Sequence, residues 1–185
     1  MYAMWEGEEG MSTLIGLTGK KQSGKSTVGK MLMDNLSFYG ISYAYGIKKF
    51  LSETYYPLLT DAHLNGDLKE VEIPELGCSA RYLMQEVGQG LRDVDPSIWL
   101  RQVESLIVLN PTHNFVITDV RYDNEMIQIW RLGGEIWEIK REPYTLEDGH
   151  KSENSITLAP DVQILNNGTI EELENVVAHI FAEER

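Results

Sequence analysis

Two spacings of apolar residues alternate along the chain, and together they predict strands separated by helices. Short apolar runs bounded by glycine or polar residues are typical of buried strands, whereas apolar residues three or four positions apart are typical of helices. Strands are predicted at 12–18, 41–46, 114–119, 135–140 and 162–165. Helices are predicted at 25–39, 47–55, 80–91, 123–132 and 169–182, with a further helix after Pro96 that runs through Trp99, Val103, Leu106 and Ile107. A polar loop is predicted at 60–77.

Strands that alternate with helices pair in parallel, because each helix carries the chain back to the edge where the next strand begins. We therefore expect an α/β fold in which a parallel sheet of about five strands is covered by helices on both faces. Ligands of such sheets bind at the carboxyl ends of the strands. Residues 141–159 lack sustained periodicity, and a loop of that length is typical of functional segments, so we expect a mobile lid there.

A phosphate-binding motif follows the first predicted strand. Residues 19–26, GKKQSGKS, match the pattern G-x-x-x-x-G-K-[ST] without a mismatch, and Thr27 follows. The flanking strand and helix allow backbone N–H groups and the helix N-terminus to surround a polyphosphate. Lys25 would reach the β- and γ-phosphates, and the Ser26 hydroxyl would coordinate Mg²⁺. The residues expected to bind the phosphates are Gly19, Lys20, Gln22, Ser23, Gly24, Lys25, Ser26 and Thr27.

Two charged residues follow the buried strand predicted at 114–119. Asp119 ends this strand, where a carboxylate would face a metal ion bound to the nucleotide, but it could instead only cap the following turn. Arg121 lies at the same sheet edge and could hold a phosphate by two hydrogen bonds, although a solvated arginine is nearly as frequent. Ser26 and Asp119 are thus candidate metal ligands, and Lys25, Asp119 and Arg121 are candidate catalytic residues.

Composition and charge narrow the class of protein. The chain has 185 residues, of which 42% are hydrophobic and 24% charged, as in soluble globular proteins. Its 16 Lys and Arg against 29 Asp and Glu give a net charge of −13, which disfavours nucleic acid or an anionic membrane as a partner. A single cysteine, Cys78, and no apolar run near the roughly 20 residues of a membrane span favour a cytoplasmic protein.

The ends of the chain and two nucleotide-binding classes can be judged by inspection. Residues 1–11 are expected to form a loose acidic extension, because Glu residues stand where an export signal would carry cations. Residues 12–185 are expected to form a single domain.

No N-K-x-D guanine-binding motif is present, since only the NNGT segment at 166–169 resembles it, so a GTPase is disfavoured. A DNA-dependent motor is disfavoured because the chain is short, acidic and without a basic stripe.

A family resemblance rests on four segments in combination. The phosphate loop, DVRYDNE at 119–125, HKSE at 150–153 and NNGT at 166–169 together resemble the phage-type deoxynucleoside monophosphate kinases. The stretch 81–99 is similar to that family's helical substrate region, and the resemblance covers about 12–182. It implies a three-layer P-loop kinase fold, a substrate-binding helical region at about 47–108 and a lid at about 141–159. It also implies Mg²⁺-dependent transfer of the ATP γ-phosphate to a deoxynucleoside monophosphate.

The resemblance also implies roles for particular side chains. Because phosphoryl transfer requires two anionic phosphates to be held in line, cations outside the loop become informative. Arg81 and Arg92 are eleven residues apart, which puts them near one face of a helix. The residues implied for binding the acceptor are Lys48, Arg81, Gln85, Arg92, Arg121 and His150. The lid residues implied are Arg141 and Lys151. The residues implied on the adenine side are Asn166, Asn167, Gly168 and Thr169. Each cation could instead be a solvated surface residue, Thr169 could cap the last helix, and Tyr82 and Trp99 are expected to be packing residues.

Alternatives to the kinase assignment remain open from the sequence. A dephospho-coenzyme A kinase shares the phosphate loop and the NNGT region, but the DVRYDNE and HKSE segments point away from it. A binding module that senses ATP without transferring phosphate is a second alternative. The resemblance favours dTMP, dGMP and a 5-modified pyrimidine nucleotide as acceptors, although no residue ranks them. A homodimer is conceivable through an apolar face of the helices around Trp99.

Overall fold

The computed structural model describes residues 12–142 and 156–183 of the chain. These residues form two compact units, of which the second comprises residues 42–105 and the first comprises the remainder. Each unit has its own buried hydrophobic cluster. No helix in the described ranges has the length and apolar character that a membrane span requires.

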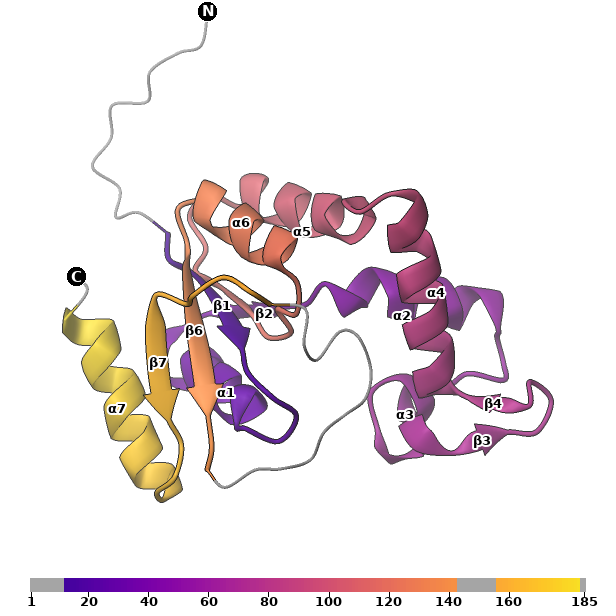
Figure 1. The fold of residues 1–185 in the computed structure, drawn as a ribbon, viewed down its shortest axis with the longest axis horizontal. Coiled ribbons are helices and arrows are strands. Elements are labelled where there is room, and N and C mark those ends of the chain that lie inside the picture. The colour runs from indigo at the N-terminus through magenta and orange to yellow at the C-terminus, as the bar shows by residue number, and fades with distance from the viewer. Residues whose placement is uncertain (1–11, 143–155, 184–185) are drawn as a thin grey trace, which may run out of the picture. The chain divides into compact units, whose positions relative to one another are not determined.

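A five-stranded parallel sheet is the frame of the first unit (Figure 1). Its strands, in spatial order, are β2 (Tyr39–Ile41), β5 (Phe115–Ile117), β1 (Leu14–Thr18), β6 (Glu135–Lys140) and β7 (Val162–Leu165). The central strand β1 pairs with β5 through Gly16 and Ile117 and with β6 through Gly16 and Ile136. Every neighbouring pair in this sheet is parallel, which confirms the predicted α/β class.

Helices cover both faces of this sheet. Helices α1 (Lys25–Leu36) and α7 (Ile170–Glu183) contact each other and enclose a core that includes Ile15 and Leu17 of β1. Helix α6 (Asp123–Arg131) packs on β1 and β6, so closely that a Cβ on Gly16 would meet Cδ1 of Ile129 at 2.5 Å. Successive residues of β1 alternate between the two faces, and both sets are buried. The three layers hold the carboxyl end of β1 rigidly in the middle of the sheet.

The second unit is mainly helical. It contains α2 (Ala44–Thr54), α3 (Asp61–Leu64), a 3₁₀ turn (Asp67–Glu70), the hairpin β3 (Glu72–Ile73) and β4 (Cys78–Ser79), and α4 (Ala80–Val94), and α5 (Ile98–Val108) begins in it. Ile47, Leu51, Met84 and Trp99 form its core, and Trp99 Nε1 donates a hydrogen bond to Gly88 O at 3.2 Å. Trp99 is therefore a packing residue, as expected, whereas Tyr82 is 53% exposed, contrary to expectation.

Three predicted elements of the sequence analysis differ most from the structure in extent or type. The strand predicted at 41–46 is instead β2 at 39–41, because α2 begins at Ala44: its Ile47 and Leu51 are buried on one face, and Tyr43, its N-cap residue, is buried as well. The helix predicted to reach Tyr39 ends at Leu36, where Ser37 adopts a left-handed conformation at φ 59°. The predicted loop 60–77 contains α3, the 3₁₀ turn and β3, since Leu64 and Ile73 fill the second core.

Candidate nucleotide site

The loop between β1 and α1 is built on two glycines with positive φ. Gly19 has φ 134° and Gly24 has φ 110°, a region of backbone space that L residues with a side chain rarely adopt. A Cβ on Gly19 would lie 2.3 Å from Ile139 O, and a Cβ on Gly24 would lie 2.3 Å from Asn166 Nδ2. Both glycines therefore serve the same purpose, which is to let residues 19–26, hereafter the P-loop, lie directly against β6 and Asn166.

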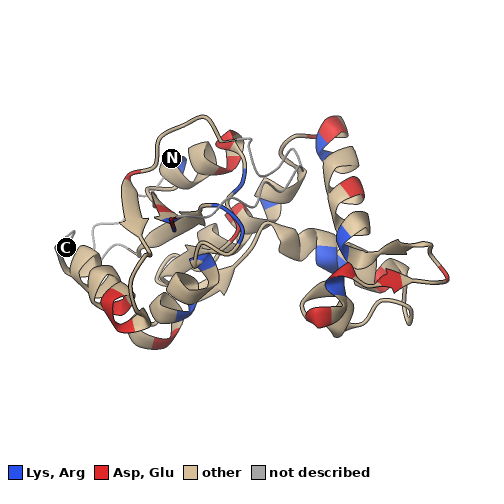
Figure 2. Cartoon of the chain, turned by 60° about the horizontal axis from the view of Figure 1, so that its bottom comes forward, with Lys and Arg blue, Asp and Glu red and all other residues tan. Residues whose placement is uncertain are grey.

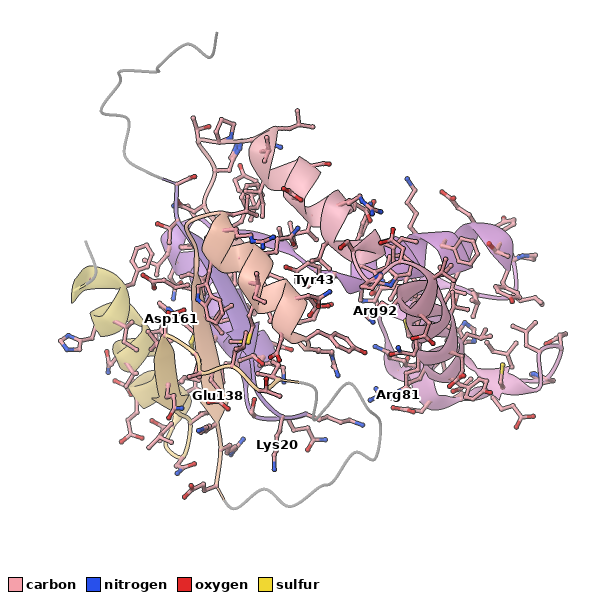
Figure 3. The ribbon with its side chains drawn as sticks, turned by 45° about the horizontal axis from the view of Figure 1, so that its top comes forward. Lys20, Tyr43, Arg81, Arg92, Glu138 and Asp161 are labelled. Atoms are coloured by element: carbon pink, nitrogen blue, oxygen red, sulfur yellow. The ribbon has the colours of Figure 1, made fainter. Side chains whose placement is uncertain are left out.

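Lys25 closes the P-loop on itself. Its Nζ donates hydrogen bonds to Gly19 O at 2.5 Å and to Lys20 O at 2.6 Å. Lys25 is the first residue of α1, whose N-terminal N–H groups carry partial positive charge. Lys20 lies on the same loop (Figure 3). The ammonium group and the helix terminus thus concentrate positive charge at one end of β1, as anion binding requires.

Ser23 leaves a polar group available inside the P-loop. The residue is only 3% exposed, and its Oγ has no hydrogen-bond partner among the residues that the structure describes. Buried hydroxyl groups are nearly always hydrogen-bonded, so a buried one without a partner calls for an explanation. A phosphate oxygen bound in the loop would give Ser23 Oγ a hydrogen-bond partner. The P-loop residues therefore fit a phosphate group.

A pocket of about 430 Å³ joins the P-loop to two distant parts of the chain. Arg141, just after β6, and the turn between β7 and α7 form its other walls. The residues that line it are Gln22, Gly24, Lys25, Ser26, Thr27, Arg141, Asn166, Gly168, Ile170 and Leu173. The structure thus brings together three of the segments that the sequence analysis selected. Ile170 and Leu173 were missed, because on sequence they belong to the apolar face of the last helix; the 70% exposure of Ile170 sets it apart.

The NNGT turn, residues 166–169, is occupied in contacts with other parts of the site. Asn166 Nδ2 donates to Ser23 O at 2.8 Å, and Asn167 Oδ1 accepts from Glu142 N at 2.7 Å, next to Arg141. Thr169 Oγ1 accepts from Glu172 N at 3.2 Å, while Glu172 Oε2 accepts from Thr169 N at 2.7 Å. This reciprocal pair is a capping box for α7, so the capping interpretation of Thr169 is confirmed.

The segment after β5 is held at the carboxyl end of β1. Val120 N donates to Leu17 O at 3.1 Å, and both Asp119 and Arg121 are half-buried beside it. Because β1 and β5 run parallel, Asp119 and the start of the P-loop lie at the same edge of the sheet. Neither Asp119 nor Arg121 is among the described residues that line the pocket, so their roles in the reaction stay predictions.

The sequence analysis included Glu125 in the segment 119–125 but assigned it no role. Its side chain is fully buried, and Oε2 accepts hydrogen bonds from Arg121 N at 2.7 Å and Tyr122 N at 3.2 Å. The carboxylate therefore fixes the backbone on which Arg121 stands. A signal was present, because an acidic residue at the third position of a helix is typical of a capping box.

The donor groups present suit a metal ion only if a nucleotide completes its coordination. In residues 12–142 and 156–183, no three or more His, Cys, Asp or Glu side chains cluster as a metal site would require. Mg²⁺ typically takes one or two protein oxygens together with phosphate and water oxygens. The Ser26 hydroxyl on the pocket wall and the Asp119 carboxylate at the same sheet edge fit that pattern.

The residues expected to bind the acceptor lie in the second unit. Arg81 and Arg92 project from the same side of α4 (Figure 3), and Gln85 is one turn after Arg81. Arg81 Nη1 is 3.3 Å from Glu70 Oε1, and its side chain is 20% exposed. Lys48 Nζ donates to Asn65 Oδ1 at 2.7 Å. Acidic residues are spread over both units (Figure 2), and Glu70 is the one that contacts Arg81. His150 and Lys151 lie outside the described residues.

Fold and site together define a class of protein. A parallel sheet with β1 at its centre, followed by a P-loop and helix α1, is the arrangement of the P-loop kinases. The family model for deoxynucleotide monophosphate kinases matches residues 62–177. A protein of Acanthamoeba polyphaga mimivirus ascribed to the same activity is 36% identical over 180 residues, covering 86% of this chain and 91% of its own. The chain belongs to the deoxynucleotide monophosphate kinase family.

Solved structures share the fold at low sequence identity. The Mycobacterium tuberculosis APS kinase CysC, in complex with AMPPNP and APS, superposes with a TM-score of 0.54 at 13% identity, covering 93% of this chain and 98% of that one. The Thermus thermophilus protein TT1252 superposes with a TM-score of 0.52 at 18% identity, covering 94% and 98%. These likenesses concern the fold alone. Family membership makes the chain a phosphotransferase that acts on a deoxynucleoside monophosphate.

A carboxylate at the start of α6 has a perturbed pKa. Asp123, at the first position of α6, accepts hydrogen bonds from Thr157 Oγ1 at 2.6 Å, Thr157 N at 2.8 Å and Leu158 N at 3.3 Å. The Thr157 hydroxyl is the main cause that holds the pKa of Asp123 below its ordinary value, since it stabilises the charged form. Asp123 thereby fastens residues 157–158 to the helix that follows Arg121.

We predict that the stabilising effect of Asp123 depends on pH. A carboxylate whose pKa is lowered by folding stabilises the folded state above its unfolded pKa of about 4, and this contribution is lost as the pH falls through the folded value. Asp123→Asn should therefore lower the free energy of unfolding at pH 7 and have a smaller effect at pH 3, as measured by urea denaturation. Glu86→Gln, at an exposed position of α4, is the control. An equal loss for Asp123→Asn at both pH values would contradict the prediction.

Proposed function

We propose that the chain transfers the γ-phosphoryl group of ATP to dTMP, dGMP or a 5-modified pyrimidine deoxynucleoside monophosphate, giving ADP and the diphosphate. The observation that supports ATP as the donor is the 430 Å³ pocket. The P-loop, Arg141 and the turn after β7 all line it. A nucleoside triphosphate needs contacts to its phosphates and to its base, and this pocket offers cationic, polar and apolar walls together.

The donor phosphates occupy the P-loop end of the pocket. Backbone N–H groups of residues 22–27 and the N-terminus of α1 bind them, and Lys25 neutralises charge on the transferring phosphoryl group. Ser26 and Asp119 would hold Mg²⁺, which would supply positive charge that neutralises the phosphates of the donor. Arg141, which also lines the pocket, adds a second cation to the donor site.

The base of the donor fits at the apolar end of the pocket. Ile170 and Leu173 supply the apolar surface there, and the backbone around Gly168 lies beside them. Contacts of this kind bind a purine ring by packing, with hydrogen bonds from the backbone to select its edge. This arrangement supports ATP as the donor, with the NNGT turn on the adenine side.

The acceptor monophosphate binds to the second unit through the cations of α4. Arg81, Gln85 and Arg92 recur at spacings that keep them on one face of this helix, and Arg81 is already oriented by Glu70. Arginine can hold a phosphate by two parallel hydrogen bonds. Phosphoryl transfer then needs no nucleophile from the protein, because the acceptor phosphate attacks directly and the protein orients, neutralises charge and excludes water.

Removal of Lys25 is the sharpest test of the donor site. Lys25→Ala should reduce turnover at least about 10²-fold, the scale of losing one preorganised charge contact in the transition state. The unfolding midpoint should stay near that of the unaltered chain. Lys30→Ala, on the same helix but in a surface ion pair with Asp34, is the matched control and should retain normal turnover. Turnover near normal for Lys25→Ala would remove this mechanism.

A second prediction separates the acceptor from the donor. Arg81→Ala and Arg92→Ala should each raise the KM for the deoxynucleoside monophosphate about tenfold or more, as expected for one charge-assisted hydrogen bond, while the KM for ATP stays constant. Arg101→Ala, which breaks an exposed pair with Asp95, is the control. If the two KM values changed together, or if neither changed, α4 would not bind the acceptor.

The acceptor itself is identified by a panel assay. ADP formation from ATP and Mg²⁺ would be measured with dTMP, dGMP, dCMP, dAMP, dUMP, a 5-hydroxymethyl pyrimidine monophosphate and dephospho-coenzyme A. We expect turnover with dTMP, dGMP or the modified nucleotide. Turnover only with dephospho-coenzyme A would contradict the proposed acceptor, and ATP binding without turnover on any acceptor would leave a sensing module as the function.

A further inference from the structure

We propose that Asn166 is a positioning residue of the donor site, whose side-chain amide holds the P-loop in the shape that binds phosphates. The proposal deepens the proposed function, since it rests on the P-loop being the site of the donor phosphates. It differs from the role expected on sequence grounds, in which the NNGT turn contacts adenine. In the expected role Asn166 would contact the adenine base, whereas in the proposed role it acts on the donor only through the P-loop.

The contact that carries the proposal joins residues 143 positions apart. Asn166 Nδ2 donates a hydrogen bond to Ser23 O at 2.8 Å, and this contact is buried. Asn166 itself is anchored, because its backbone N donates to Lys140 O at 2.7 Å at the end of β6. Only 9% of the residue is exposed. A rigid part of the sheet is therefore connected to the carbonyl of a single P-loop residue.

The amide also contacts the P-loop at one of its two glycines with positive φ. A Cβ on Gly24 would lie 2.3 Å from Asn166 Nδ2, so the amide nitrogen packs on the Gly24 backbone. Gly24 has φ 110° and is the last residue before α1. Asn166 thus binds the carbonyl oxygen of the peptide between Ser23 and Gly24. The N–H of the same peptide, which belongs to Gly24, then points away from Asn166. In a peptide plane the N–H and C=O groups point in opposite directions, so a fixed carbonyl also fixes the N–H.

Loss of this hydrogen bond has two consequences for anion binding. The Ser23 carbonyl would keep a buried oxygen without its donor, which favours rotation of the peptide toward water. The ligand would then have to reorder the loop, and ordering lowers affinity for any phosphate that the loop binds. The effect does not depend on the base, because the contact lies at Ser23 and Gly24, where the phosphates bind.

Inorganic tripolyphosphate distinguishes this role from contact with adenine. Asn166→Ala should weaken binding of both ADP and tripolyphosphate about tenfold in titration calorimetry with Mg²⁺, the change expected for one hydrogen bond of about 1.4 kcal/mol. Asn110→Ala is the matched control, because Asn110 Nδ2 also donates to a backbone carbonyl, Leu106 O, at 2.8 Å. If Asn166→Ala weakened ADP but left tripolyphosphate unchanged, the residue would contact the base and the proposal would be overturned.

Two further measurements keep the proposal testable. Asn166→Asp preserves the shape of the side chain but turns the donor into an acceptor and adds negative charge, so tripolyphosphate affinity should fall further than in Asn166→Ala. Tripolyphosphate affinity near normal in Asn166→Asp would overturn the proposal even if Asn166→Ala failed to fold. Because binding is measured without an acceptor, the result is independent of turnover. Absence of deoxynucleotide kinase activity in the unaltered chain would refute the proposed function and leave this inference standing.

Discussion

The close approach of the P-loop to the end of β6 is the constraint on which the site depends. It is possible only because Gly19 and Gly24 have no side chain and adopt positive φ, which lets the loop lie against Ile139 O and Asn166 Nδ2. Lys25 then ties its ammonium to Gly19 O and Lys20 O, and α1 begins at once. Asn166, on another wall of the pocket, is hydrogen-bonded to this loop.

The sheet order explains why distant segments serve one pocket. With β1 in the centre and β6 and β7 on one side, the residues after β6 and β7, Arg141 and Asn166, come to the same edge as the P-loop. Asp119, after β5, approaches that edge from the other side. Parallel strands all end at one edge, so each crossover can add one residue to the site. Asn166 and Asn167 then connect these contributions through their side-chain amides.

Much of the first unit was predictable because its signals are local. The strands β6 at 135–140 and β7 at 162–165 agree with prediction at both ends, since each is an apolar run between turn residues. The motif at 19–26 predicted the P-loop for the same reason. The strand β2 was misplaced, because the prediction took residues 42–46 as strand although Tyr43, Ile47 and Leu51 have the four-residue spacing of a helix.

The sequence by itself determined the chemistry, namely a phosphate loop, a kinase family and a set of cations on α4. Only the tertiary structure decided what individual polar side chains do. The amide of Asn166 binds Ser23 O from 143 residues away, and the carboxylate of Asp123 binds the Thr157 hydroxyl from 34 residues away. The physical reason is separation in the sequence. A hydrogen bond between distant segments produces no pattern among neighbouring residues, whereas a glycine turn, a cap or an apolar spacing can be recognised from residues close together in the chain.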